Sequence, residues 1–312
     1  MRAVIARAFG GPDVLEHLDV PTPDPGPGQV RIRVKAAAVN PVDAATRAGD
    51  LARAGLMTER SPIGIGWDAA GVIDATGPGV TAFTPGDAVI GLRDRLDVPL
   101  GAYAEHLILD ATAVAPAPAG VTPEQAATIP LNALTAWQAL HALDLAAGAT
   151  LLVTGAAGAV GAYAVELAAQ RGLRVAATAS AADEQFVRGL GATWFVPRTT
   201  GDLPAAVRAH LPGGVDGALD AAVIGARALE AVRNRGAFAA VVAGGAPVPL
   251  RGTRVTNVWI SADGDQLARL SELAAAGRLT TRVADVLPLK DAEHAHRRLH
   301  EGGLRGRLVL TP

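Results

Sequence analysis

The sequence predicts an α/β protein that combines a β-rich barrel with a doubly wound parallel sheet. Two observations lead to this prediction. Residues 1–120 contain many short apolar or alternating runs separated by Gly/Pro turns, which is typical of a compact barrel. Residues 121–260 alternate apolar strands with helical segments around one glycine turn, which favours a parallel sheet with helices on both faces. With 312 residues the chain is long enough for two domains.

The glycine turn is the strongest local signal. The apolar run Leu151–Thr154 enters Gly-x-x-Gly-x-x-Gly, with Ala156 at the first glycine of a strict G-x-G-x-x-G pattern, and a helical pattern follows. The unpaired N–H groups and the dipole at such a helix start bind a pyrophosphate. A turn without a nucleotide is disfavoured, because strands at 174–179 and 193–196 follow with the spacing of a βαβ unit. The expected contacts are Gly155, Ala157, Gly158, Ala159, Val160 and Gly161.

The composition excludes several classes of function. The net charge of −2 offers no electrostatic attraction for nucleic acid or an anionic membrane. The chain has no cysteine, which excludes disulfides, thiolate zinc sites, iron–sulfur clusters and a cysteine nucleophile. The N-terminal segment is too charged for a signal peptide. We therefore expect a cytoplasmic protein.

Individual elements follow from local patterns. Thr122 before Pro123 and Glu124 predicts the start of a helix. The tail 304–310 is a predicted strand, and because it lacks a parallel partner nearby in the sequence we expect it to join the N-terminal barrel. The other predicted strands are 30–34, 71–75, 87–90, 103–109, 215–222, 236–243 and 255–260, with a helix at 265–276.

A series of motifs along the chain resembles the medium-chain dehydrogenase/reductase superfamily, specifically its zinc-independent, zeta-crystallin-like quinone oxidoreductase branch. The motifs are Asn40-Pro41-Val42-Asp43, Gly66-Trp67-Asp68-Ala69-Ala70-Gly71, Gly86-Asp87-Ala88-Val89, Ile129–Trp137, the turn at 154–161 and Gly302–Arg307. The resemblance implies a GroES-like catalytic domain, built from 1–120 and 263–312, and a Rossmann domain at 121–262 that binds NADPH.

Two related enzyme families fit less well. Zinc alcohol dehydrogenases need a Cys where this chain has Pro41-Val42 and a His where it has Trp67, so a zinc-activated alcohol is disfavoured. Short-chain dehydrogenases place the glycine turn near the N-terminus and need Tyr-x-x-x-Lys. Both tyrosines of this chain, Tyr103 and Tyr163, have leucine four residues later.

The residues after the second strand of the βαβ unit favour NADPH over NADH. An NAD-specific fold places an acidic residue there to bind the ribose 2′-hydroxyl. This chain has Ser180, which leaves room for a 2′-phosphate, and Arg198 after the third strand can pair with that phosphate. The alternative role for Arg198 is that of a solvated loop residue.

The resemblance also implies a substrate site. Asn40 and Asp43 lie on the loop that lines the family's cleft; Asn40 is the candidate donor to a developing oxyanion, and Asp43 is expected to hold the loop. Leu51 replaces a family tyrosine and makes the substrate pocket more apolar. Thr135, Val242, Ala243, Gly244, Trp259 and Ile260 are expected near the nicotinamide, with packing in the core or a subunit interface as the alternative for Trp259.

The histidines are expected to bind no metal. His294, His296 and His300 lie on a predicted surface helix, where His296 and His300 share a face, but the surrounding run is charged. His106 lies in an alternating strand and is assigned to packing or to the surface.

These observations predict a zinc-independent NADPH-dependent quinone oxidoreductase that acts on a small molecule. Reduction of the activated C=C bond of an enone or enal remains an alternative. A non-catalytic NADPH-binding sensor or partner protein is a second one, because the family tyrosine is missing at Leu51. The strand at 255–260 is expected to pair with its copy in a homodimer.

Overall fold

The computed structural model describes residues 1–96 and 98–312. It divides into two compact units, of which unit 1 comprises Met1–Leu131 with Ser261–Pro312 and unit 2 comprises Asn132–Ile260. The first division lies after Leu131, the second residue of α4 (Pro130–Leu143), whereas the sequence placed it at residue 120. A physical reason is that the buried carboxylate of Asp68 accepts the N–H of Leu131 at 2.5 Å, which ties the start of α4 to unit 1.

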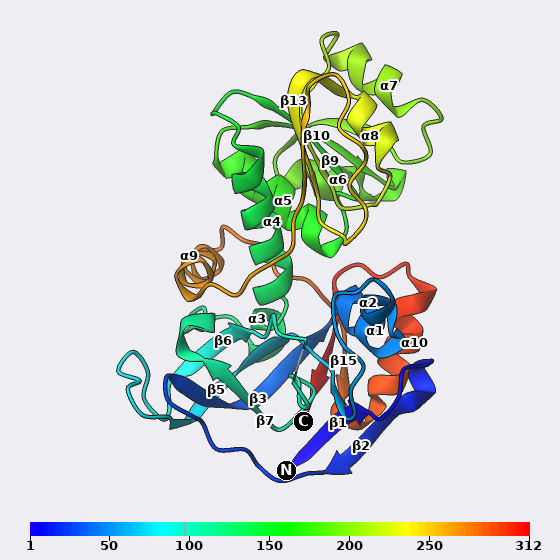
Figure 1. Cartoon of the computed structure of the whole chain (residues 1–312). Coiled ribbons are helices and arrows are strands. Elements are labelled where there is room, and N and C mark those ends of the chain that lie inside the picture. Colours follow the sequence, from blue (N-terminus) through cyan, green and yellow to red (C-terminus); the bar gives the residue numbers. More distant parts are fainter. Residues whose placement is uncertain (97) are drawn as a thin grey trace. The chain divides into compact units, whose positions relative to one another are not determined.

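Unit 1 is built on two sheets, shown in Figure 1. The larger sheet has the order β15-β16-β3-β5-β6-β8, with β7 paired to β3, and the smaller has the order β2-β1-β4. The strands are β1 Arg2–Ala6, β2 Leu15–Asp19, β3 Gln29–Val39, β4 Ile63–Gly64, β5 Asp68–Thr76, β6 Ala88–Leu92, β7 His106–Asp110, β8 Val114–Pro116, β15 Val283–Pro288 and β16 Arg307–Thr311.

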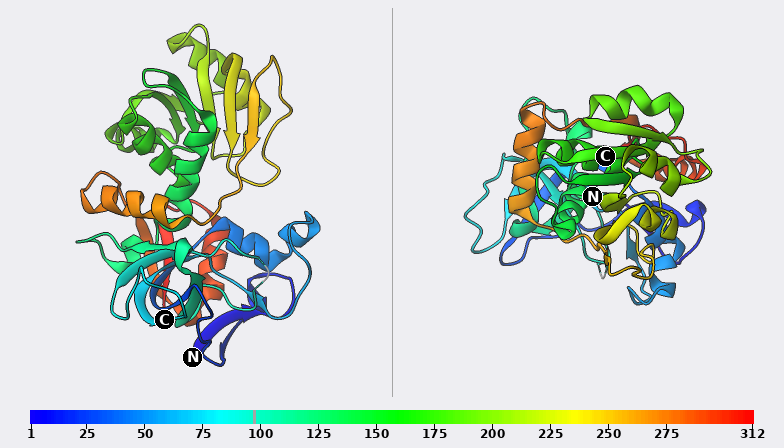
Figure 2. Two further views of the ribbon diagram at one scale, coloured as in Figure 1. Left: turned by 60° about the vertical axis from the view of Figure 1, so that its left-hand side comes forward. Right: turned by 90° about the horizontal axis from the view of Figure 1, so that it is seen from above.

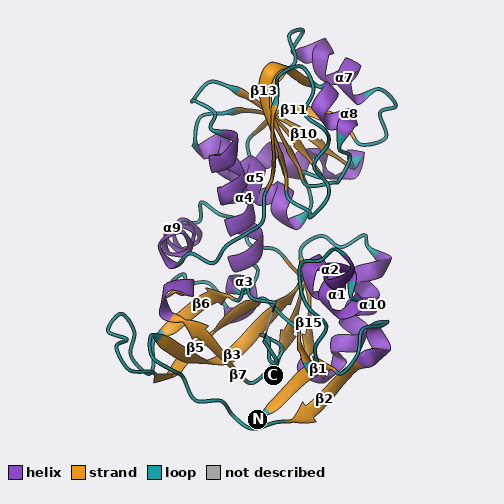
Figure 3. Cartoon of the chain, viewed as in Figure 1, coloured by secondary structure: helices purple, strands orange, loops and turns teal. Residues whose placement is uncertain are grey.

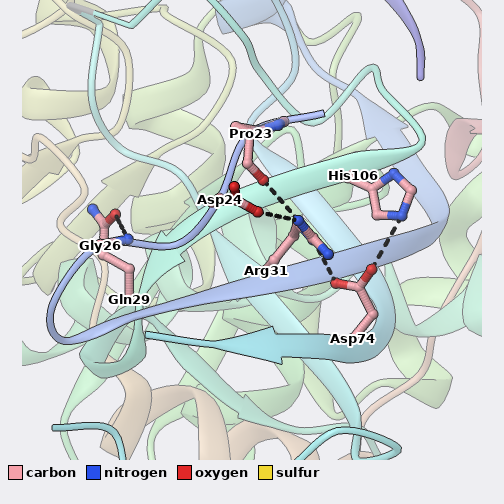
Figure 4. A network of polar contacts seen from close by, with 7 residues as sticks. All are labelled: Pro23, Asp24, Gly26, Gln29, Arg31, Asp74 and His106. Atoms are coloured by element: carbon pink, nitrogen blue, oxygen red, sulfur yellow. Dashed lines mark hydrogen bonds and ion pairs between the residues drawn. The ribbon is translucent and has the colours of Figure 1, made fainter. Parts of the chain in front are cut away.

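Strand β3 shows how the alternating pattern builds this unit. Val30, Ile32 and Val34 are buried in its core, as the alternation predicted. On the other face, Arg31 donates to Asp74 at 2.9 Å and to Asp24 at 3.0 Å, and the imidazole of His106 lies 3.2 Å from Asp74 (Figure 4). These contacts fasten the proline-rich loop before β3 to the sheet.

The C-terminal strand joins the N-terminal half of the chain, as predicted. β16 pairs antiparallel with β3, with Leu308 opposite Val39. It also pairs parallel with β15, to which it is connected through α10 (Ala292–Glu301). The expectation that no parallel partner lies nearby was therefore wrong. β15 was missed because Val283–Pro288 has no buried residue and lacks a regular apolar alternation.

The helices of unit 1 begin at recognisable caps. Thr122 accepts the N–H of Gln125 at 3.3 Å, and the Gln125 side chain accepts the N–H of Thr122, so the predicted helix start is confirmed. The N–H of Gln266 donates in the same way to Asp263 at the start of α9. The α-helices are α1 Pro41–Ala48, α2 Asp50–Arg53, α3 Pro123–Ala126, α9 Gly264–Ala275 and α10 Ala292–Glu301.

Unit 2 contains a parallel six-stranded sheet of order β11-β10-β9-β12-β13-β14. The chain runs outward from β9 to β11 and then returns to the other side of β9, which is the doubly wound Rossmann order. Figure 3 shows this sheet with helices beside it. Its strands are β9 Thr150–Thr154, β10 Arg174–Ala179, β11 Ala192–Pro197, β12 Val215–Asp220, β13 Val232–Ala240 and β14 Arg254–Asn257.

Helices cover both faces of this sheet, and Figure 2 gives two further views of them. Helix α5 packs against β9 and β10, while the buried side chains of α7 and α8 pack against Leu152, Ala218 and Phe238. The predicted strand at 255–260 is shorter than expected, since β14 ends at Asn257. The helices are α4 Pro130–Leu143, α5 Ala159–Gln170, α6 Glu184–Gly189, α7 Leu203–His210 and α8 Ala226–Glu230. Over the residues that the structure describes, no helix is both long and apolar enough to span a bilayer.

Candidate active site

The glycine turn connects β9 to α5 with the geometry of an anion-binding loop. Gly155 has φ +60°, which an L-residue with a side chain rarely adopts, and a Cβ on Gly161 would lie 2.2 Å from the Gly155 carbonyl oxygen. Gly158 precedes α5 with extended backbone, so the first N–H groups of the helix have no intrahelical acceptor. Gly155 adopts the left-handed conformation that the turn needs, so the next position can be an alanine. Ala156 is buried in the turn, and its N–H donates to the carbonyl of Thr178.

Asp220 organises the neighbouring loop and was missed by the sequence analysis. It is buried at the carboxyl end of β12, opposite Thr154 of β9, whose hydroxyl donates to it at 2.5 Å. Its carboxylate also accepts the N–H groups of Ala222, Ile224 and Gly225 at 3.2, 3.3 and 2.7 Å. One side chain thus shapes the loop at the point where the strand order reverses, which is where ligands bind in open α/β sheets. The only sequence signal was an acidic residue ending an apolar strand.

Ser180 and Arg198 are brought together by the sheet. They follow the adjacent parallel strands β10 and β11, and the Arg198 N–H donates to the carbonyl of Ala179 at 2.8 Å. The Arg198 side chain is exposed, and its guanidinium forms no hydrogen bond or ion pair with the residues that the structure describes. An exposed guanidinium beside the end of the second strand is suited to a phosphate.

The other predicted cofactor contacts have different environments. Val242, Ala243 and Gly244 follow β13 at the same carboxyl edge, and all three are exposed. Trp259 is 42% exposed after β14, so its side chain is not packed in the core of the chain; Ile260 is half-buried. Thr135 is buried within α4.

Unit 1 contains a buried polar chain that begins at the predicted substrate loop. The Asn40 side-chain amide donates to Asp68 at 2.6 Å, and the Asn40 backbone N–H donates to Asp43 at 2.8 Å, which closes the first turn of α1. Asp43 therefore fastens the start of α1. Asn40 is fully buried, so its amide faces Asp68 and not solvent. Leu51, expected in the substrate pocket, is also buried.

The series of buried hydrogen bonds continues from Asp43 to α10, and the donor and acceptor of each bond can be assigned. The Tyr103 hydroxyl donates to Asp43 at 3.3 Å and lies 3.2 Å from Nε2 of His296. Because the hydroxyl has one proton, Nε2 of His296 must be the donor to it, and Nδ1 then accepts from Arg47 at 3.4 Å. His296 is therefore neutral and in a single tautomer, on a helix that the sequence analysis assigned to the surface.

Burial changes the proton affinities along this chain. It raises the pKa of Asp43 to about 6 and that of Asp68 to about 7, because each carboxylate is fully enclosed. Burial, together with the charge of Arg47, lowers the pKa of His296 to about 3. It also raises the pKa of Tyr103 well above its usual value, and the Asp43 charge adds to this. Among the described residues, Oδ1 of Asp43 and Nε of Arg47 are buried without a hydrogen-bond partner.

The three histidines of α10 do not converge. His296 points into the core, whereas His294 and His300 are exposed. Outside residue 97, no group of three or more His, Cys, Asp or Glu side chains lies close enough to hold a metal ion. His106 contacts Asp74 on the barrel surface instead.

Known proteins resemble both ends of the chain and its whole fold. Residues 26–119 match the alcohol dehydrogenase GroES-like domain, and residues 190–310 match the zinc-binding dehydrogenase family. A crystal structure of an NAD-dependent alcohol dehydrogenase is 33% identical, with a TM-score of 0.89 and complete coverage of both chains. The chain belongs to the medium-chain dehydrogenase/reductase superfamily. A mycobacterial member of the superfamily complexed with NADPH is 30% identical, with a TM-score of 0.84 and complete coverage of both chains.

Curated relatives place the chain among the quinone-oxidoreductase-like members of the superfamily. Human quinone oxidoreductase is 37% identical over 189 residues, which is 60% of this chain and 55% of that protein. An NADPH-dependent alkenal/one oxidoreductase of Arabidopsis thaliana is 29% identical over 95% of this chain and 78% of its own length. A pikromycin polyketide synthase component of Streptomyces venezuelae is 46% identical over 42% of this chain. The matched parts span about 3% of that synthase and about half of the human protein.

Proposed function

We propose that this medium-chain dehydrogenase/reductase is a zinc-independent NADPH:quinone oxidoreductase. The observation that carries the proposal is the carboxyl edge of the unit 2 sheet, which carries the glycine turn, the Asp220-held loop and Arg198. The similarity to quinone oxidoreductases supports the reaction class. The absence of cysteine from the sequence supports independence from zinc, because a member with the usual thiolate ligand needs one.

The residues of unit 2 fit a nicotinamide dinucleotide. A side chain at Gly161 would collide with the turn, so its absence allows α5 to approach β9 and presents the first helical N–H groups to a pyrophosphate. The hydrogen bonds to Asp220 hold the adjacent loop in one conformation before a ligand arrives. When bound, the cofactor supplies the hydride that reduces the substrate. The exposed, uncharged residues at 242–244 can shield a reacting face from water.

The preference for NADPH rests on the second and third strands of the βαβ unit. The residue after β10 is Ser180, which has no carboxylate that would repel a phosphate. A backbone hydrogen bond from Arg198 to Ala179 keeps Arg198 beside this end of the strand. A guanidinium binds a phosphate with two parallel hydrogen bonds, while a ribose hydroxyl offers it no charge.

Asn40, Asp43 and Leu51 belong to the proposed substrate side as positioning residues. Each is buried, and the Asn40 amide is bonded to Asp68. We assign them the task of holding the segment 40–51, so that its backbone keeps one conformation when substrate binds. The proton that completes reduction then comes from solvent, because the buried carboxyl groups have no exposed surface.

Steady-state oxidation of NADPH and NADH tests the proposal. The substrate panel holds a benzoquinone, a naphthoquinone, an enone, an enal and an alcohol–aldehyde pair. We expect quinone turnover with a lower KM for NADPH than for NADH, unchanged by a metal chelator. Tight NADPH binding without turnover of any substrate would refute the enzyme and favour a sensor or partner protein.

Reduction of activated C=C bonds is the second candidate. The Arabidopsis relative named for alkenals and alkenones matches nearly the whole chain, whereas the human quinone oxidoreductase match covers 60% of it. Both reactions transfer a hydride from the same cofactor to a conjugated acceptor. Turnover confined to the enone and enal of the panel would select this candidate.

We also propose a homodimer formed through β14. This strand lies at the end of the six-stranded sheet, so its outer edge has free backbone groups that a second copy can pair with. Val248 and Leu250, in the preceding loop, are 76% and 47% exposed and would be covered in such a pair. Sedimentation equilibrium should give twice the monomer mass, and a monomer at micromolar concentration would contradict the proposal.

A further inference from the structure

Unit 2 contains a surface cavity of about 720 Å³, widely open to solvent, that the proposed function does not use. It is lined by residues from α7, from the end of α8, from the start of β13 and from the loop before β14. Because β12 and β13 run parallel, this position is at the amino-terminal edge of the sheet. The glycine turn and Arg198 are at the opposite, carboxyl edge.

Three arginines from three different segments meet at this cavity. Arg208 comes from α7, Arg233 from β13 and Arg251 from the loop before β14. Arg208 donates to the carbonyl of Glu230 at 2.5 Å, and Arg251 donates to the carbonyls of Leu229 and Val232 at 2.9 and 3.1 Å. These backbone acceptors hold both guanidinium groups in place, so little side-chain freedom remains to be lost on binding.

The charges of the cavity are only partly balanced. Arg233 pairs with Asp216 at 2.7 Å. Arg208 and Arg251 have no carboxylate within ion-pair distance in the described parts of the chain, and the Glu230 side chain on the rim is exposed and makes no ion pair there. Each of these two guanidiniums uses one terminal nitrogen and keeps its other N–H groups available.

Capping of α8 accounts for part of this arrangement. Cations near the last carbonyls of a helix are favourable, and Arg208 and Arg251 both bind carbonyls at that end. Capping needs one cation, however, and it does not explain why a third arginine lines the same space. Arg251 also adopts a left-handed backbone with φ +54°, and its carbonyl accepts the N–H of Arg235, which has φ +59°. Two arginines in this region of φ indicate that the local conformation is imposed by the surrounding structure.

We propose that this cavity is a second ligand site, for a small molecule that carries a doubly charged anionic group. The volume is in the range of ligand pockets and exceeds the needs of a single inorganic ion. A phosphate ester and a polycarboxylate share the required chemistry, since both offer several oxygen acceptors to the forked N–H donors of Arg208 and Arg251.

Arginine side-chain NMR spectra test the proposal on the intact protein. The Nε–Hε signals of Arg208, Arg233 and Arg251 are followed during titration with inorganic pyrophosphate and, separately, with citrate. The amide signals of Gly155 and Gly161 report binding at the glycine turn in the same samples. The test variant is Arg208→Gln/Arg251→Gln. Its matched control is Arg174→Gln/Arg188→Gln, which removes two other exposed arginines from unit 2.

We expect saturable shifts at the three cavity arginines of the wild type and the same affinity in the control variant. In the test variant only the Arg233 signal remains, and the affinity that it reports should be at least tenfold lower. A response to pyrophosphate alone identifies a phosphate-bearing ligand, and one to citrate alone identifies a polycarboxylate. Absence of shifts in the wild type, shifts confined to the glycine turn, or equal weakening in both variants would each overturn the proposal. Arg251→Lys keeps the helix-capping charge, so it should remain folded even if the double variant does not. It should still weaken binding, because it lacks the forked donors.

Discussion

Replacement of Asp68 by asparagine should reveal a pH-dependent cost of the buried polar chain. Burial raises the pKa of Asp68 to about 7, from an unfolded value of 3.8. The folded state therefore holds a proton that the unfolded state has already released, and stability falls as the pH rises through this window. The difference between these two pKa values corresponds to at most about 4 kcal/mol of stability, lost between about pH 4 and pH 7.

Asparagine removes the ionisation but also one hydrogen bond. The two oxygens of Asp68 accept from the Asn40 amide and from the Leu131 N–H, whereas an asparagine side chain has a single acceptor oxygen. The unsatisfied donor should cost about 1–3 kcal/mol at every pH. Asp68→Asn should therefore be less stable than the wild type at pH 4.5, and the difference should vanish or reverse by pH 8.

Urea unfolding followed by circular dichroism at pH 4.5, 6, 7 and 8 measures this difference. Asp110→Asn, which changes an exposed carboxylate in the same unit, is the control and should show a constant offset. The reasoning would be refuted if the difference in the free energy of unfolding between Asp68→Asn and the wild type stayed constant with pH. It would also be refuted if that difference increasingly favoured the wild type as the pH rises.

Four further substitutions test other parts of the structure. Arg198→Gln should weaken NADPH binding about 10- to 100-fold and leave NADH unaffected, as measured by fluorescence titration, because only the phosphate can accept charge-assisted hydrogen bonds. Gly161→Ala should abolish cofactor binding, because its Cβ would lie 2.2 Å from the Gly155 oxygen. Gly158→Ala should have a milder effect, because its Cβ would lie 3.1 Å from the same oxygen. Similar cofactor affinities of these two variants would contradict the proposed packing. His296→Gln should destabilise unit 1 by about 1–3 kcal/mol in urea unfolding. The pKa of His296 is lowered to about 3, so its neutral form adds stability as the pH rises from about 3 to 6.5, and the penalty of the variant should grow over that range.

Much of the fold could be predicted from local patterns. The period-two alternation of β3, the capping residues of α3 and the strand–turn–helix at Gly155 each depend on neighbours a few residues apart. β15 could not be predicted in this way, because its pairing with β16 is made through backbone hydrogen bonds that do not need an apolar pattern. The end of β14 likewise depends on where its partner β13 stops pairing.

The sequence by itself determined the chemistry that is local along the chain. The exclusion of thiolate chemistry depends only on which residues are present. The glycine spacing, and the position of Ser180 without an acidic residue directly beside it, depend only on the order of nearby residues. The tertiary structure decided which groups are removed from water and which distant groups meet. Asn40 was predicted to face a substrate, yet it is enclosed with Asp68, 28 residues away, and His296 meets Tyr103 across 193 residues. Burial and long-range pairing set proton affinity and hydrogen-bond direction, and neither is encoded by the spacing of residues along the chain.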